Sequence, residues 1–126
     1  MKRLFPLILI LLLSSCQRKA VEEFVSYVKT ADELFSSGQD EEAMIALTSA
    51  EDAYTEDVPL VELGSVKMRK GDIYYRFSNF KDAVNAYTEG TDIFLSAGDT
   101  LNYTRGMLLV CDASILDLDA AGAHMC

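Results

Sequence analysis

The chain has 126 residues, of which half are hydrophobic and a quarter are charged, with three cysteines, one histidine and no tryptophan. This length allows one small domain, and the composition argues against a disordered chain. Twenty acidic residues against eleven basic ones give a net charge of −9. Because a surface of this sign repels phosphate backbones, we expect no nucleic-acid partner.

The first fifteen residues have the features of a signal peptide. A basic pair, Lys2 and Arg3, precedes a ten-residue apolar run over residues 4–13. This run is shorter than the ~20 apolar residues that a membrane-spanning helix needs, and its length suits the core of a secretory leader. The sequence LSSC at residues 13–16 then resembles the lipobox of bacterial lipoproteins.

In the lipoprotein family, the leader is cleaved before the cysteine, whose thiol carries lipid. The resemblance therefore implies a signal peptide over 1–15, lipidation of Cys16 and a tether over 16–19, with two or three acyl chains forming a lasting membrane anchor. An ordinary secretory leader with a chance cysteine is the alternative. In enteric lipoproteins an aspartate after the cysteine favours the inner membrane. Since Gln17 stands there, we expect the outer membrane, facing the periplasm, rather than the inner membrane.

From residue 20 onward the chain has helical patterning, because apolar residues recur at helical spacing and strand patterns are absent. Turn-forming residues interrupt the pattern at 36–38, 56–59, 78–79 and 96–99. We predict helices near 20–36, 41–55, 60–77, 80–95 and 100–117, and part of a sixth from about 120. Helices joined by short turns pack as antiparallel hairpins, so the expected fold class is all-α.

The helical pattern repeats at a shift of forty residues. Ala31-Asp32 aligns with Gly71-Asp72, and the pair recurs as Cys111-Asp112. A repeat of about this length, built of helix pairs, indicates a helical solenoid, here with repeats near 20–58, 59–99 and, incomplete, 100–126. We expect small residues where the two helices of a hairpin cross closely, and large residues where hairpins stack.

The second repeat resembles a tetratricopeptide repeat over RKGDIYY at 69–75 and FKDAVNAY at 80–87. Gly71, Tyr74, Ala83 and Tyr87 match the family pattern, whereas the proline that usually closes the repeat is missing, and the period exceeds the common one of about 34. The resemblance implies a right-handed superhelical array of antiparallel helix hairpins, about two and a half repeats long, that binds other proteins. An unrelated array of helical hairpins is the alternative.

The resemblance also suggests a binding groove. Aspartates occupy one phase of the first helix in each repeat, and in the family this phase faces the concave groove where partner peptides lie. The candidate groove residues are Asp32, Phe35, Met68, Asp72, Tyr75, Arg76 and Asp112. Carboxylates beside aromatic side chains favour a basic extended segment as partner; a solvated inner face without a specific partner is the alternative.

No catalytic motif is recognisable, and we expect neither an enzyme, nor a cofactor, nor a metal site. Adjacent acidic pairs such as Glu41-Glu42 do not converge on a helix, and His124 lacks cysteines at the short paired spacing of zinc sites. We expect Cys111 to be a small buried residue at a helix crossing. A disulfide between Cys111 and Cys126 in an oxidising envelope is the alternative.

The sequence ends within the repeat pattern, at AGAHMC over residues 121–126. Because repeat arrays normally finish with a polar capping helix, we expect a portion of a longer protein, or an edge that a partner completes. The expected function is a membrane-anchored protein-interaction module of the bacterial cell envelope. The alternative is the N-terminal sensor segment of a membrane-bound signalling or transcription regulator.

Overall fold

The computed structural model describes residues 4–120, with side chains from Arg18 onward, and this part of the chain contains helices and no strand. The elements are α1 (Leu4–Ser36), α2 (Asp40–Asp52), α3 (Leu60–Arg76), α4 (Phe80–Ser96) and α5 (Thr100–Ala120). The all-α prediction is therefore confirmed.

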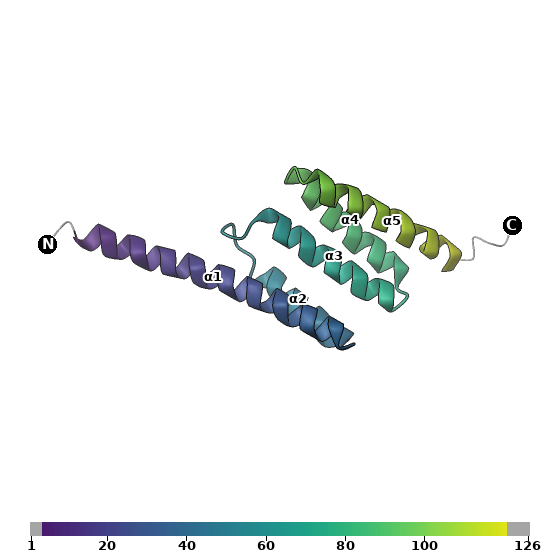
Figure 1. Ribbon diagram of the computed structural model, residues 1–126, viewed down its shortest axis with the longest axis horizontal. Coiled ribbons are helices and arrows are strands. Elements are labelled where there is room, and N and C mark those ends of the chain that lie inside the picture. Colours follow the sequence, from purple (N-terminus) through teal and green to yellow (C-terminus); the bar gives the residue numbers. More distant parts are fainter. Residues whose placement is uncertain (1–3, 121–126) are drawn as a thin grey trace.

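Neighbouring helices pack as antiparallel hairpins, as predicted. The most extensive contacts join α1 to α2, α3 to α4, and α4 to α5, whereas the first hairpin meets the second mainly through α2 and α3. Figure 1 shows the helices stacked in chain order, with α5 at one edge and the first half of α1 extending away from the stack. Over residues 4–120, the array therefore comprises two hairpins and the first helix of a third.

Helix boundaries agree closely with the predicted ones except at the N-terminus. We expected the first helix to begin near residue 20, but α1 begins at Leu4. Pro6 stands in the first turn, where proline is tolerated because the first N–H groups of a helix have no intrahelical partner. No further proline or glycine follows before residue 38, so the helix continues. The sixth helix would fall in residues outside the described part.

Small residues lie where α3 crosses α4, as the repeat pattern predicts. A Cβ atom at Gly71 would collide with the ring of Tyr87, and a Cβ atom at Gly64 would lie 2.8 Å from Phe94 Cε1. The crossing of α1 and α2 uses alanines instead, among them Ala31 and Ala43, which are 2% and 0% exposed. Small side chains therefore set the separation of the two helices in each hairpin.

An ionic cluster also joins the hairpins. The Lys67 ammonium on α3 lies 3.3 Å from Glu51 on α2 and 3.2 Å from Glu89 on α4, and Lys70 lies 2.8 Å from Glu51. Partial burial lowers the pKa of Lys67, but the Glu51 and Glu89 carboxylates outweigh this effect and raise it above its ordinary value. Lys67 therefore stays charged and links three helices.

The turn between α1 and α2 and the turn between α3 and α4 have the same backbone conformation at positions forty residues apart. Gly38 has φ +80° and Ser78 has φ +60°. In each turn the next residue donates its N–H to a carbonyl near the helix end, from Gln39 to Leu34 and from Asn79 to Tyr74. Glycine adopts this left-handed conformation freely, whereas a residue with a side chain is strained by roughly 1–2 kcal/mol.

Exchanging the turn residues should shift stability in opposite directions. Ser78→Gly should raise the free energy of unfolding by about 0.5–1 kcal/mol, because relief of strain exceeds the added freedom of the unfolded chain. Gly38→Ser should lower it by a similar amount, although no atom would touch a Cβ there. Urea denaturation measures both variants. If both variants changed the free energy of unfolding in the same direction, residues 38 and 78 would not share the left-handed conformation described.

Candidate functional site

The face formed by α1, α3 and α5 is hollowed in three places. A hollow of about 680 Å³ lies between α1 and α3. A second of about 320 Å³ is lined by α1, α2 and α3, and a third of about 230 Å³ is lined by α3, α4 and α5. We call the first the α1–α3 groove. Its lining residues are Phe24, Val25, Val28, Lys29, Asp32, Glu33, Ser36 and Glu62.

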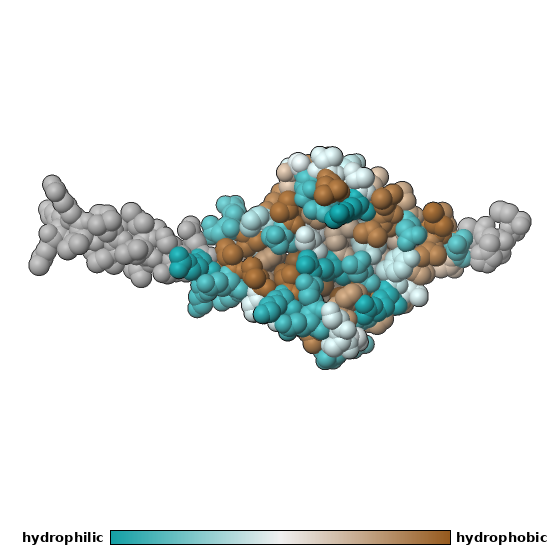
Figure 2. Space-filling model, in the orientation of Figure 1, coloured by the Kyte–Doolittle hydropathy of each residue, from teal (hydrophilic) through white to brown (hydrophobic). Residues whose placement is uncertain are grey.

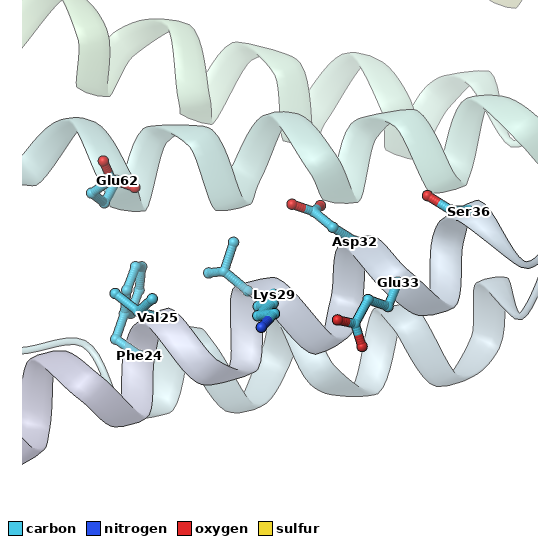
Figure 3. A pocket seen from close by; sticks show the side chains of 8 residues that line it. Phe24, Val25, Lys29, Asp32, Glu33, Ser36 and Glu62 are labelled. Carbon is cyan, nitrogen blue, oxygen red and sulfur yellow. The ribbon is translucent and has the colours of Figure 1, made fainter.

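The floor of the α1–α3 groove is apolar. Phe24 is buried, Val28 is half-buried, and Val25 leaves 55% of its surface exposed. Figure 3 shows Glu62 extending from α3 above Phe24 and Val25, and Figure 2 shows apolar atoms gathered where α1 meets α3. Because the hairpins stack mainly through α2 and α3, this side of α1 stays open to solvent.

The rim of the groove is acidic. Asp32, Glu33 and Glu62 face one basic lining residue, Lys29. Asp32 is already engaged, since Arg69 donates Nε to Oδ1 at 2.8 Å and Nη2 to Oδ2 at 3.2 Å. Glu33 and Glu62 form no salt bridge with any residue in the described part of the chain. With three carboxylates and one ammonium group, the lining therefore carries a net negative charge beside the apolar floor.

The three aspartates of the predicted acidic row each accept a hydrogen bond from the protein itself. Asp32 accepts from Arg69, Asp72 accepts from the Tyr87 hydroxyl at 2.6 Å, and Asp112 accepts from the Tyr75 hydroxyl at 2.9 Å. Asp32 and Asp72 line the second hollow together, whereas Asp112 lines none of the three. The structure thus brings two of the three aspartates together.

Other residues of the predicted groove also contact neighbouring helices of the protein. The Arg76 guanidinium lies 3.6 Å from the centroid of the Phe35 ring, a cation–π distance, and Nη1 donates to buried Asp40 at 2.7 Å. Met68 packs against Gly90 of α4 and lines the third hollow. Phe35 and Arg76 therefore join α1 to α3 and partly cover each other.

The sequence analysis did not predict that Arg69 binds Asp32 or that Arg76 binds Asp40. The residue spacing nevertheless indicates the first of these two pairs. Asp32 and Arg69 are 37 residues apart, and so are Tyr75 and Asp112. This spacing is one repeat less about one helical turn, so it joins the first helices of successive repeats. The exposed floor residue Val25 had no such signal, because its exposure depends on how far apart two hairpins stand.

Asp72 and Tyr87, which are hydrogen-bonded to each other, both have raised pKa values. Partial burial of the carboxyl group raises the pKa of Asp72 above its ordinary value, more than the Tyr87 hydrogen bond and the nearby guanidinium groups lower it, although the residue as a whole is exposed. Burial, reinforced by the Asp72 carboxylate, also raises the pKa of Tyr87. The hydroxyl therefore stays protonated and remains the donor.

The free energy of unfolding of Asp72→Asn, relative to that of the wild type, should increase as the pH rises. A raised pKa means that the folded state holds the proton more tightly, so the wild type loses stability between about pH 4, the ordinary value, and the raised pKa. Asparagine keeps an oxygen for Tyr87 and stays neutral, so the variant avoids this loss. Urea denaturation from pH 3.5 to 7 measures the difference, and a variant that weakens relative to wild type with rising pH would contradict it.

Cys111 does not occupy the expected buried position. It is exposed on α5, whereas the equivalent Gly71 on α3 is covered by Tyr87 of α4. Among the described residues, α5 packs chiefly on α4, through the face that holds buried Gly106 and Ala113, and Cys111 lies on a different face. The sixth helix, expected from about residue 120, falls outside the described part. The proposed disulfide partner, Cys126, lies there too, and the side chain of Cys16 lies outside the described residues at the other end.

Comparisons with known proteins assign no family. No family model matches the sequence, and neither a curated protein nor a solved structure is significantly similar to it. Within the described residues, no group of three or more His, Cys, Asp or Glu side chains is placed to hold a metal ion. Nor does any helix in that range have an apolar stretch long enough to cross a bilayer.

Proposed function

We propose that the protein is a lipid-anchored, tetratricopeptide-like module that binds another protein in the bacterial cell envelope and has no catalytic activity. The α1–α3 groove carries this proposal, because it combines an open apolar floor with two carboxylates that form no salt bridge with a described residue. Exposed apolar surface rimmed by polar groups marks interaction sites in proteins. The helix-hairpin array supports it further, since such arrays present extended concave binding surfaces.

The chemistry of the groove specifies the class of partner. An apolar side chain would cover Val25 and Val28, and flanking lysine or arginine residues would approach Glu33 and Glu62. The lining runs from Phe24 to Ser36, which is about 18 Å along a helix and matches five or six residues of an extended chain. The expected ligand is a short basic segment with an apolar centre, and the complementary charge would chiefly increase its specificity and association rate.

The proposed anchor would hold this groove near a membrane. The lipobox resemblance marks Cys16 as the acylated residue, and α1 runs without interruption from Leu4 to Ser36. Phe24 is eight residues beyond Cys16, which is about 12 Å along a helix. A basic segment that lies next to the membrane in another envelope protein therefore fits both the chemistry and the position of the groove.

Substitutions in the groove should reduce partner binding. Val25→Lys and Glu62→Lys each place a positive charge where a basic segment would lie, so recovery of a specific envelope partner should fall about tenfold, equivalent to ~1.4 kcal/mol. Ile45→Lys is the matched control, because Ile45 is 67% exposed on α2 and lies outside the groove. Pull-downs from envelope extract compare the three variants with wild type.

The expected loss should shrink at high salt, because part of the attraction is screened. Circular dichroism should show that all three variants fold. If every partner recovered by wild type were recovered equally by Val25→Lys and Glu62→Lys, the groove would not be the binding site. Loss with Ile45→Lys as well would point to a non-specific effect of added charge.

Cys16→Ala should abolish lipidation. In a Gram-negative host, the wild type should incorporate labelled palmitate and fractionate with the outer membrane, whereas the variant should remain unlabelled and be released or accumulate as precursor. Cys111→Ala is the control and should be labelled like the wild type. A wild-type protein that incorporates no palmitate would show that the lipobox interpretation is wrong.

A further inference from the structure

The outer face of α5 is apolar, and no other described helix covers it. Leu101, Leu108, Ile115 and Leu118 keep 62%, 68%, 60% and 59% of their surfaces exposed. With Thr104 and Cys111, which are also exposed, they form one stripe with alternating spacings of three and four residues, which we call the α5 seam. This spacing is the a/d pattern by which two helices pack side by side.

The α5 seam corresponds to a face that is buried in the preceding repeat. Forty residues earlier, Met68 packs against Gly90 of α4, and Gly71 is covered by Tyr87. Their counterparts on α5 are Leu108 and Cys111. Figure 1 shows α5 at the edge of the array, and Figure 2 shows apolar atoms over its C-terminal half. The seam thus has the pattern of a helix-packing surface rather than that of a solvated face.

We propose that the α5 seam binds the same seam of a second copy of the protein, in antiparallel orientation. The antiparallel register aligns Leu101 with Leu118 of the second copy, Thr104 with Ile115, and Leu108 with Cys111. Each pair occurs twice, as two-fold symmetry requires. At the centre the large Leu108 meets the small Cys111, so the two helices can approach closely.

The charges beside the seam favour the antiparallel orientation. Arg105, Asp112 and Asp119 lie along one edge of the seam, at seven-residue intervals, and the opposite edge carries Met107 and Ser114. In an antiparallel pair, like edges face each other, so Arg105 of one copy approaches Asp112 or Asp119 of the second. In a parallel pair, the charged edge would face Met107 and Ser114, and these charges would meet no opposite charge on the second copy.

The size of the seam suits a specific interface. From Leu101 to Leu118 it spans about 26 Å of helix, and side-by-side packing over this length, including Met107, which is 42% exposed, can reach the ~1,000 Å² that a specific interface requires. The seam lies on α5, whereas the α1–α3 groove lies at the other end of the array. Dimerisation would therefore leave the proposed partner site open.

Sedimentation velocity of the full chain in excess non-ionic detergent tests the proposal. We expect a dimer for the wild type and a monomer for Leu108→Lys, with dimer affinity reduced at least a hundredfold. Ile45→Lys is the control, because Ile45 is 67% exposed on α2, and it should remain dimeric. Circular dichroism should show equal folding of both variants. A monomeric wild type at 100 μM, or a dimeric Leu108→Lys, would overturn the proposal.

Cysteine cross-linking tests the orientation. In full-length protein whose Cys111 and Cys126 are replaced by serine, with Cys16 kept because its thiol would carry the proposed lipid, Leu101→Cys and Leu118→Cys variants are mixed and oxidised. The antiparallel pair predicts a cross-linked heterodimer, since a disulfide requires Cα atoms within about 7 Å. Homodimers cross-linked through 101–101 and 118–118 would show a parallel pair, and no cross-link at all would show that α5 is not the interface.

Discussion

The contact between Gly71 and the ring of Tyr87 fixes the distance between α3 and α4, and the rest of the array depends on this distance. Any side chain at Gly71 would collide with the ring, and at the other end of the crossing a Cβ atom at Gly90 would lie 2.9 Å from the Gly64 carbonyl oxygen. Helices that approach this closely leave Tyr87 only 2% exposed. Its hydroxyl donates a hydrogen bond to Asp72 at the edge of the crossing. The packing of the hairpin therefore also influences the pKa of the Asp72 carboxyl group.

The face formed by α1, α3 and α5 shows which acidic groups are open to a partner. The aspartates that recur in each repeat accept hydrogen bonds from Arg69, Tyr87 and Tyr75, and the links over 37 residues hold the first helices of successive repeats in register. Charges that recur with the repeat therefore help to stabilise the array. Glu33 aligns with Ile73 and Ala113, whereas Glu62 aligns with Glu22 of the first repeat. Glu33 and Glu62 are the lining carboxylates of the α1–α3 groove that form no salt bridge with a described residue. The proposed specificity of the α1–α3 groove accordingly depends on these two carboxylates rather than on the aspartates that recur in each repeat.

The sequence predicted the helices and their hairpin pairing well, because both depend on local periodicity and on turns such as those at Gly38 and Ser78. Small residues at the crossings were predicted for the same reason, since Gly71 and Ala83 recur with the repeat. The start of α1 was not, because the leader and the first repeat share helical propensity with no breaker between them. The α1–α3 groove and the internal partners of the aspartates were not predicted either, since they depend on the separation of whole hairpins. Cys111 was predicted to be buried at a helix crossing, whereas it is exposed on α5.

The stability of Gly71→Ala tests the account most directly. In an unobstructed helical position, glycine to alanine raises the free energy of unfolding by about 1 kcal/mol, because alanine is the better helix former. At Gly71 the added methyl group would meet the Tyr87 ring, and we predict instead a loss of about 1–3 kcal/mol in urea denaturation, with reduced protection of the α3 and α4 amides from hydrogen exchange. A gain of about 1 kcal/mol would show that α3 and α4 do not cross as closely as described.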